Sequence, residues 1–535
     1  MVVGCYIQVI LPLRLAWIPC YWNDFPLPEG QKVTVPLAGR QYIGVVWKSC
    51  VTPEIEPGRV QCIIRVNSEL SPVSAEELRF WEFLSNYYLC TIGEVYKAAY
   101  PSGKTKSEQT GANILARLKA RLAIRDEALQ KKHKDNVRQR LEAERSSIAA
   151  QIAALTRIPG RNPVKQTPPQ PLLIVGGNRT GRYISLCRGI VEQGLNALIL
   201  LPEIAASEQL EAVFESEFPG VTHIVNSHIT ETRRRRIAED VRSFGGQIVI
   251  GTRSALFLPL SRLGLVIVDQ EQDVYFKQTD PAPRYNARDA AVMLARIHRA
   301  SAVLGTPAPS LESLHNAQTG KYTLEETSAP LPPMTLIDIN AERRKNGMPG
   351  RLSLKLIDSI RATDGPVALI RGWEKPDELL SEAAAALPGR SIDILTLQEA
   401  RLKDLGGYAL IAVVQADALG GADSFRADEH ALQALALLRE ACKGTFIVQT
   451  AKPEHPVFGE PHQTYAQLLQ ERREFSLPPF TRIVDTVCGT RKERYTLPSD
   501  GTLAARKQEI FNRALAQEKS SRGKLRTTID VDPIV

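Results

Sequence analysis

The sequence predicts an α/β protein in which a small β-domain precedes two parallel sheets. From Pro171 onward, short apolar runs alternate with helical segments, and the same alternation starts again near residue 331. Strands that alternate with helices form parallel sheets with helices on both faces. Residues 1–65, in contrast, contain short strand-like runs separated by turn signals such as Pro28-Glu29-Gly30.

Length and composition set broad limits. The 535 residues are enough for three or four domains, and the net charge of +8 favours a polyanionic partner such as nucleic acid. No apolar run is long enough to span a bilayer, so no membrane contact is expected. The N-terminus alternates like a strand and lacks a basic n-region, which predicts a cytoplasmic protein. Eight cysteines without a Cys-x-x-Cys pair predict scattered thiols and no zinc ligands.

The N-terminal elements follow from period-two patterns and helix starts. Two helices are expected after the N-terminal strands, one that begins at Ser71-Pro72 and one over Ile92–Ala99. This pair of helices suggests a winged-helix-like module. The strands expected before it are Ile7–Leu11, Gln31–Pro36, Tyr42–Val46 and Cys62–Val66.

Residues 111–155 are rich in charges of both signs at helical spacing, and Pro159–Pro171 is a proline-rich linker. A solvated helical arm is the main interpretation of the charged segment, and a nucleic-acid contact is the alternative.

The strands of the two sheets are predicted from short apolar runs. A helix is expected over Tyr183–Gln193. The strands of the first sheet are Leu172–Val175, Ala197–Leu201, His223–Val225, Gln247–Ile250, Leu265–Asp269 and Ala302–Leu304. Those of the second are Met334–Ile339, Val367–Ile370, Ile392–Leu395, Leu410–Gln415 and Thr445–Thr450.

Two segments stand where a nucleotide-driven motor would have its phosphate and magnesium motifs. A phosphate-binding loop reads G-x-x-x-x-G-K-[ST], but the eight residues from Leu173 to Thr180 keep only Thr180, with Arg179 at the lysine position. Gly176-Gly177 alone would be a tight turn. A magnesium motif reads Asp-Glu-x-His, where the Asp holds Mg²⁺ and the Glu polarises water. Here Asp269-Gln270-Glu271-Gln272 places an amide at the second position, and an amide cannot act as a general base.

Further segments occur in an order that is specific for one family. Gly251-Thr-Arg-Ser-Ala255 is followed by Leu263–Asp269, by Arg284-Tyr-Asn-Ala-Arg-Asp289 and, in the second sheet, by Ser424-Phe-Arg426. In this order and spacing the chain resembles the primosomal protein N′ (PriA) family of superfamily 2 replication-restart helicases, over most of its length.

The resemblance implies two RecA-like helicase lobes, the second shortened, behind a β-domain and a winged-helix-like module. The expected limits are 1–68 for a 3′-DNA-end-binding-like β-domain, 69–104 for the winged-helix-like domain, 105–170 for the basic arm and linker, 171–330 for lobe 1 with a degenerate ATP site, 331–460 for a truncated lobe 2, and 461–535 for a C-terminal domain.

The chain departs from the family's pattern where chemistry is expected. The coupling motif reads Gly305-Thr-Pro-Ala-Pro-Ser310, and the cysteine-rich zinc insertion expected after Val367–Ile370 is missing. Ala431–Leu438 replaces the helix that carries the family's arginine finger, and Pro19-Cys20-Tyr21 departs from the pocket for a DNA 3′ end. The family implies ATP and Mg²⁺ as cofactors, but these losses together predict a motor without catalytic residues.

The nucleotide-site residues that remain are interpreted as vestigial. A purely structural role, with Thr180 as a helix cap and Asp269 as a turn residue at the end of a strand, is preferred to retained binding of Mg·ATP. The vestigial set is Gly177, Arg179, Thr180, Asp269 and Glu271.

Contacts to a phosphate backbone are the function that the remaining basic residues predict. A second basic run, Arg233–Arg236, could equally be a solvated face. The candidate DNA-binding residues are Arg253, Ser254, Lys277, Arg284, Arg288 and Arg426.

Three functions stay open at this point. The chain could recognise forked, single-stranded or 3′-ended DNA and recruit replication-restart and primosome proteins without unwinding. It could be an active ATP-dependent 3′–5′ DNA helicase that tolerates its substitutions. It could also be an interaction scaffold that no longer binds DNA.

Overall fold

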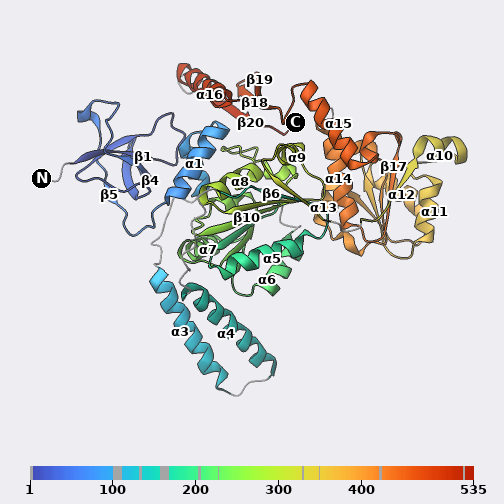
Figure 1. Ribbon diagram of the computed structural model, residues 1–535, viewed down its shortest axis with the longest axis horizontal. Coiled ribbons are helices and arrows are strands. Elements are labelled where there is room, and N and C mark those ends of the chain that lie inside the picture. The colour runs from blue at the N-terminus through green and yellow to red at the C-terminus, as the bar shows by residue number, and fades with distance from the viewer. Residues whose placement is uncertain are drawn as a thin grey trace.

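The computed structural model describes residues 4–100, 111–131, 135–156, 168–202, 207–226, 228–327, 331–348, 350–420, 424–521 and 525–534. Four sheets follow one another along the chain, and two of them are entirely parallel. The predicted α/β class with an N-terminal β-domain is therefore confirmed (Figure 1).

The N-terminal sheet is antiparallel, in the order β2-β1-β4-β3-β5. Its core is made by alternate side chains such as Ile7, Val9 and Val33, all fully buried, as the period-two pattern predicts. Two details differ from the expectation: β2 was not predicted, and β5 is much shorter than Cys62–Val66. The strands are β1 (Cys5–Ile10), β2 (Cys20–Asn23), β3 (Lys32–Leu37), β4 (Arg40–Ser49) and β5 (Arg65–Val66).

Two helices link this sheet to the rest of the molecule. Helix α1 (Ala75–Tyr88) begins later than the expected start at Ser71-Pro72, because Ser74 and Glu77 form a reciprocal capping box there. Helix α2 (Ile92–Ala99) has the predicted limits. Gly93 lets α2 approach the sheet, since a Cβ at this position would lie 2.0 Å from the carbonyl oxygen of Leu13.

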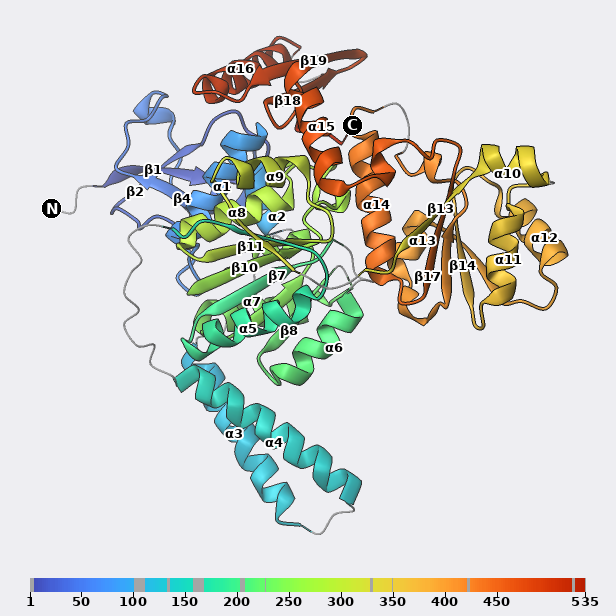
Figure 2. The ribbon, with the colours of Figure 1, turned by 45° about the vertical axis from the view of Figure 1, so that its right-hand side comes forward.

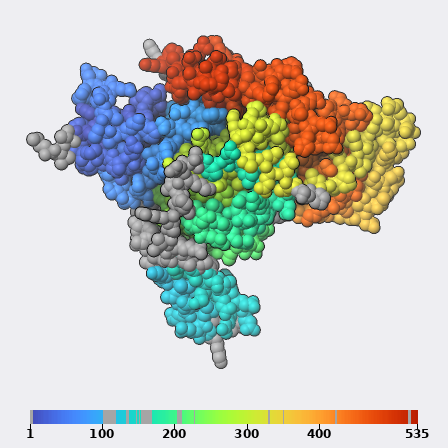
Figure 3. Space-filling view, in the orientation of Figure 1, coloured from blue at the N-terminus to red at the C-terminus, as the bar shows by residue number. Residues whose placement is uncertain are grey.

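The charged segment forms a helical hairpin of α3 (Gly111–Leu129) and α4 (Asp135–Thr156). It projects from the body of the molecule, as Figure 3 shows. Ion pairs join the two helices, among them Arg125–Glu144 at 2.8 Å and Arg145–Asp126 at 2.6 Å. These pairs agree with a solvated arm.

Lobe 1 is a seven-stranded parallel sheet in the order β12-β6-β11-β10-β7-β9-β8. The polar edge strand β12 was not predicted. The strands are β6 (Leu172–Val175), β7 (Asn196–Leu200), β8 (Thr222–Val225), β9 (Ile248–Gly251), β10 (Leu263–Asp269), β11 (Ser301–Thr306) and β12 (Thr323–Glu326). The helices are α5 (Arg179–Glu192), α6 (Ser207–Glu217), α7 (Glu231–Ser243), α8 (Ala287–His298) and α9 (Leu311–Gln318).

Lobe 2 is a five-stranded parallel sheet in the order β13-β17-β16-β14-β15. Each predicted strand is present. The strands are β13 (Met334–Asp338), β14 (Val367–Arg371), β15 (Ile392–Thr396), β16 (Leu410–Val413) and β17 (Thr445–Thr450). The helices are α10 (Ile339–Asn346), α11 (Leu354–Ala362), α12 (Pro376–Ala386), α13 (Leu397–Leu402) and α14 (Ala427–Ala441).

The chain ends in a three-stranded antiparallel sheet, β19-β18-β20, which the sequence patterns did not predict. Figure 2 shows it above lobe 1. Its elements and the preceding helix are α15 (Pro461–Glu474), β18 (Thr481–Cys488), β19 (Arg491–Pro498), α16 (Leu503–Ser520) and β20 (Thr527–Val531). The exact domain limits stay predictions. In the described ranges, no helix has the length and apolar character needed to cross a membrane.

Candidate functional site

The site begins where β6 ends and α5 starts. Gly176–Asn178 forms the turn between them, and Gly176 has a φ of 111° while Asn178 has a φ of 58°. Glycine and asparagine are the residues that most readily adopt such left-handed backbone. Because parallel strands end at the same edge of a sheet, this turn lies at the same edge as Asp269 at the end of β10, with the end of β11 between them.

Arg179, the first residue of α5, is the centre of an ion-pair cluster. It is only 7% exposed. Its Nε donates to Asp269 Oδ1 at 3.2 Å, while Nη1 and Nη2 donate to the two carboxylate oxygens of Glu440 at 2.7 and 3.1 Å. Nη1 also donates to the carbonyl oxygen of Gly176. The planar guanidinium thus forms a bidentate pair with Glu440 and a further pair with Asp269.

Asp269 has a second donor on the same oxygen. The hydroxyl of Tyr183 donates to Asp269 Oδ1 at 2.8 Å, and burial raises the pKa of Tyr183 well above its usual value. The tyrosine fits because the neighbouring strand carries Gly305, where a Cβ would lie 1.6 Å from the tyrosine hydroxyl. Gly305 therefore permits the contact between Tyr183 and Asp269.

The charge of Arg179 is maintained by its two acidic neighbours. Burial opposes the charged form, but the carboxylates of Asp269 and Glu440 outweigh it and raise the pKa of Arg179 above its usual value. Arg179 is therefore positively charged at ordinary pH and lies between two acidic side chains.

The residues present do not fit a magnesium–nucleotide complex. The phosphate-facing cation is turned towards Asp269 and Glu440, and Asp269 Oδ1 already accepts two hydrogen bonds. The next residue is the amide Gln270, with a φ of 53°. In the described part of the chain, no group of three or more His, Cys, Asp and Glu side chains is placed to hold a metal ion.

Glu271 is buried, and its carboxylate is surrounded by hydrogen-bond donors of the protein. It is 1% exposed and accepts hydrogen bonds from the amide of Ser310 at 2.7 Å and from the hydroxyls of Ser310 and Ser313 at 2.9 and 2.8 Å. Arg288 Nη1 lies 3.3 Å from its carboxylate. Burial raises the pKa of Glu271 despite these partners. The carboxylate joins the end of β10 to the start of α9.

The other vestigial positions have modest roles. The carbonyl oxygen of Gly177 accepts a hydrogen bond from Thr327 Oγ1 at 2.7 Å. Thr180 is the second residue of α5 and half-buried. The assignment of all five residues to a former nucleotide site stays a prediction.

The candidate DNA-binding residues in the loops before and after β10 have partners inside the protein. Lys277 is 5% exposed, and its Nζ lies 2.6 Å from Asp530 in the C-terminal sheet. Arg284 pairs with Asp280 at 2.9 Å. Arg253 Nη1 donates to the carbonyl oxygen of Lys277 at 2.7 Å. These contacts tie the strand-end loops together.

The remaining three candidates are also engaged. Ser254 accepts a hydrogen bond from Arg234 at 3.4 Å. Arg288 pairs with Asp289 at 2.7 Å as well as with Glu271. Arg426 pairs with Glu312 at 2.6 Å and with Glu429 at 3.0 Å. DNA contact by these six residues stays a prediction, and the structure gives each of them an internal partner.

Sequence patterns missed the acidic residues that join the lobes. Glu440 lies near the end of α14, in a helix otherwise rich in alanine and leucine, and no motif marks it. Glu429 Oε1 accepts a hydrogen bond from the amide of Leu311 in lobe 1 at 2.9 Å. Arg401 in lobe 2 pairs with Asp273 in lobe 1 at 3.1 Å. Only the fold brings these side chains to the interface.

The N-terminal sheet carries a cavity of its own. It has a volume of about 200 Å³, and its walls include Trp17, Cys20, Tyr21 and Ile55. Trp17 is 59% exposed and Ile55 52% exposed, whereas the hydroxyl of Tyr21 donates to the carbonyl oxygen of Pro36 at 3.0 Å. The segment Pro19-Cys20-Tyr21 therefore forms part of a small open cavity.

Two parallel-sheet lobes meet at one interface through Arg179 and Glu440, an arrangement that agrees with the helicase-like α/β class expected from the sequence. The sequence comparisons are more specific. Residues 8–101 match the model of the 3′ DNA-binding domain of PriA. The replication restart protein PriA of Rickettsia conorii is 28% identical over 354 residues, covering 63% of this chain and 48% of that protein. PriA of Haemophilus influenzae is 40% identical over 149 residues, covering 28% of this chain and 20% of that protein.

The resemblance to the PriA family is thereby confirmed. The chain spans about half the length of the Rickettsia conorii relative that it matches. Among solved structures, RecG bound to a three-way DNA junction is 13% identical, covers 83% of this chain and 66% of its own, and superposes with a TM-score of 0.37.

Proposed function

We propose that this chain is a PriA-like protein of replication restart that binds forked or 3′-ended DNA without hydrolysing ATP or unwinding the duplex. It would recruit replication-restart and primosome proteins to that DNA. The observation that carries the proposal is the cluster of Arg179, Asp269 and Glu440, in which protein side chains take the partners that a nucleotide would need.

The arrangement of charge across the lobe interface supports the loss of hydrolysis. A motor of this class places an arginine on one lobe against the phosphates held by the other, and removing it costs three to five orders of magnitude in rate (about 10³–10⁵). Here lobe 1 carries the arginine, Arg179, and helix α14 of lobe 2 presents a carboxylate, Glu440. Lobe 2 thus presents a negative charge where a positive charge would be required to stabilise a phosphoryl group, and a carboxylate would repel that group.

The interface between the lobes supports a fixed platform. Besides Arg179–Glu440, it contains Arg401–Asp273 at 3.1 Å and Arg426–Glu312 at 2.6 Å. Motors couple hydrolysis to movement between lobes, and every one of these ion pairs would have to break in such a movement. The ion pairs therefore favour one position of lobe 1 relative to lobe 2.

The N-terminal part supports DNA binding. Residues 8–101 match a DNA-binding domain of PriA, and the cavity lined by Trp17 and Tyr21 lies within this segment. An exposed aromatic ring such as that of Trp17 is a suitable surface for stacking a base. The net charge of +8 favours the same partner.

The deciding experiment measures ATP hydrolysis by the full chain with and without forked DNA, beside fluorescence-anisotropy titrations with forked and with blunt duplex DNA. We expect hydrolysis at the buffer background and a salt-sensitive preference for the fork. Hydrolysis that is stimulated by DNA and abolished in Asp269→Ala would establish the active-helicase alternative. Equal and salt-insensitive affinity for both DNAs would favour the scaffold alternative.

A further inference from the structure

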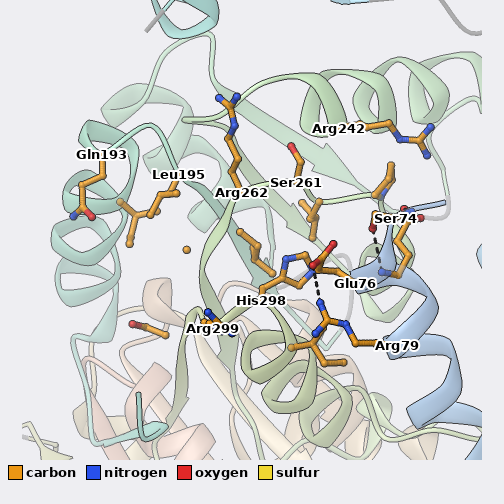
Figure 4. A pocket seen from close by; sticks show the side chains of 18 of the residues that line it. Ser74, Glu76, Arg79, Gln193, Leu195, Arg242, Ser261, Arg262, His298 and Arg299 are labelled. Atoms are coloured by element: carbon orange, nitrogen blue, oxygen red, sulfur yellow. Dashed lines mark hydrogen bonds and ion pairs between the residues drawn. The ribbon is translucent and has the colours of Figure 1, made fainter. Parts of the chain in front are cut away.

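A second cavity lies at the opposite edge of the lobe 1 sheet from Arg179. It has a volume of about 740 Å³ and separates the start of α1 from the loops that lead into β10 and β11 (Figure 4). Because the strands are parallel, this edge contains their first residues, whereas Asp269 and the Arg179 cluster stand at their last. We call this cavity the α1 cleft.

Four arginines line the α1 cleft: Arg79, Arg242, Arg262 and Arg299. Two of them are engaged. Arg79 pairs with Glu76 at 2.7 Å, and Arg242 Nη2 donates to the hydroxyl of Tyr100 at 3.2 Å. The first partner lies on α1 and the second, Tyr100, directly after α2, so both arginines are already engaged by the N-terminal part of the chain.

The other two arginines occupy unusual backbone positions. Arg262 has a φ of 50° and Arg299 a φ of 56°, the left-handed region in which glycine or asparagine is the usual choice. Both are exposed, and within the described residues neither guanidinium forms a salt bridge. Arg262 immediately precedes β10 and Arg299 lies two residues before β11. These strands are neighbours in the sheet, so the two side chains start beside adjacent strands.

The acidic and titratable groups of the cleft do not neutralise this pair. Glu76 is paired with Arg79, and the carboxylate of Glu77 accepts hydrogen bonds from the amide of Ser74 at 2.9 Å and from the hydroxyl of Tyr100 at 3.1 Å. His298 is neutral near pH 7, because burial lowers its pKa to about 4. Two cations therefore remain on the side of the cleft that lobe 1 provides.

We propose that the α1 cleft binds the phosphate backbone of a short stretch of single-stranded DNA, through Arg262 and Arg299. This inference rests on the proposed DNA-binding function and names a site for it. The planar guanidinium matches the oxygens of a phosphate, and two such groups on adjacent strands suit successive phosphates. The volume lies within the range of roughly 300–1,000 Å³ that encloses a small ligand, which suits a few nucleotides and not a duplex.

The wall opposite these arginines favours nucleic acid over an acidic peptide. That wall consists of residues such as Ser74, Glu76 and Arg79, which belong to the segment that matches a DNA-binding domain. A strand bound to the domain could therefore continue into the α1 cleft, between this segment on one side and Arg262 and Arg299 of lobe 1 on the other. An acidic peptide in the same place is an outcome that the experiment separates.

The experiment compares the full chain with the double variant Arg262→Gln/Arg299→Gln in titrations of a fluorescein-labelled single-stranded oligonucleotide between 50 and 200 mM salt. Each lost phosphate contact reduces the slope of log affinity against log salt by about 0.7 for single strands. We expect the slope to become less steep by about 1.4 and the affinity at low salt to fall about tenfold. The control is Arg343→Gln/Arg344→Gln, which removes the same charge from exposed residues of α10 in lobe 2.

A photoreactive benzoylphenylalanine at Gln193, in the wall of the α1 cleft, locates the DNA directly. We expect a crosslink to the oligonucleotide from this position and none from position 343. The inference is overturned alone if the parent chain binds DNA but the double variant keeps its slope and Gln193 does not crosslink. It is also overturned if the double variant loses affinity only for an acidic peptide. If the parent chain binds no DNA, the proposed function is overturned as well.

Discussion

The guanidinium of Arg179 donates hydrogen bonds to both carboxylate oxygens of Glu440, at 2.7 and 3.1 Å, although the two residues lie 261 positions apart in the sequence. One belongs to the first helix of lobe 1 and the other to the last helix of lobe 2. A bond pattern of this kind fixes orientation as well as distance, because both planar groups must be coplanar to form it.

Removing one partner of this pair should be costly. We expect Arg179→Met to lower the free energy of unfolding by about 3–5 kcal/mol, because the partly buried carboxyl groups of Asp269 and Glu440 would lose their cationic partner. The double variant Arg179→Met/Glu440→Met should lose less than the sum of the two single variants, and urea unfolding of all four proteins measures this coupling.

The exposed pair Arg188–Glu217, at 2.8 Å with side chains 53% and 43% exposed, is the matched control. Its replacement by two methionines should change stability by less than about 1 kcal/mol. Additive costs for Arg179 and Glu440 would show that their contact contributes nothing.

Gly305 is predicted to be essential for the environment of Asp269. Gly305→Ala would bring a Cβ to 1.6 Å from the hydroxyl of Tyr183, so the ring must move away from Asp269. We expect a loss of about 1–3 kcal/mol in thermal or urea unfolding. Gly181→Ala on α5 has open space around its Cβ and should be neutral or stabilising by up to about 1 kcal/mol. Equal stability of the two variants would contradict the role of Gly305.

Glu429 should protect one backbone amide of the other lobe. Its Oε1 accepts from the amide of Leu311 at 2.9 Å, so Glu429→Ala leaves that amide without its partner. We expect hydrogen exchange at Leu311 to accelerate by about tenfold, which corresponds to about 1.4 kcal/mol. The amide of Leu314, bonded to the carbonyl oxygen of Ser310, is the internal reference and should not change. Acceleration at both positions would indicate unfolding of α9 and not a local loss.

Acidification should destabilise the protein through His298. Burial lowers the pKa of this side chain from 6.5 to about 4, with Glu76 favouring and Arg79 opposing its protonation. The unfolded chain therefore binds more protons between pH 6.5 and 4, and stability is lost as the pH falls through this window. His298→Gln should lose less stability than the parent between pH 7 and pH 5 in urea unfolding. Identical losses in both proteins would assign the effect to other groups.

The sequence predicted the parallel strands well because they are buried on both faces and form short apolar runs. Strand β12 was missed because Thr323–Glu326 lies at the sheet edge and is polar, so it lacks that pattern. The C-terminal strands β18 and β19 are likewise partly exposed. The two strands form a local hairpin in which Cys488 lies opposite Arg491, and only the pairing of β18 with β20 joins residues far apart in the sequence.

The candidate site was predicted only in part. The strand and the turn before Arg179 follow from local patterns, a single apolar run and a glycine pair, whereas α5 begins at Arg179, four residues before the expected start of the helix at Tyr183. Glu440 could not be found in this way, because a lone glutamate near the end of a helix is common on protein surfaces. Its role arises from the packing of one lobe on the other.

The Arg179–Glu440 bridge also differs from a nucleotide in how it is supplied. A diffusible nucleotide joins two lobes only while its free concentration exceeds its dissociation constant. A contact made through a nucleotide therefore depends on the nucleotide concentration in the surrounding solution. Arg179 is attached to the chain, and its effective concentration at Glu440 is set by geometry alone. The closed contact between the lobes is therefore present from the moment the protein has folded, whatever the supply of nucleotide.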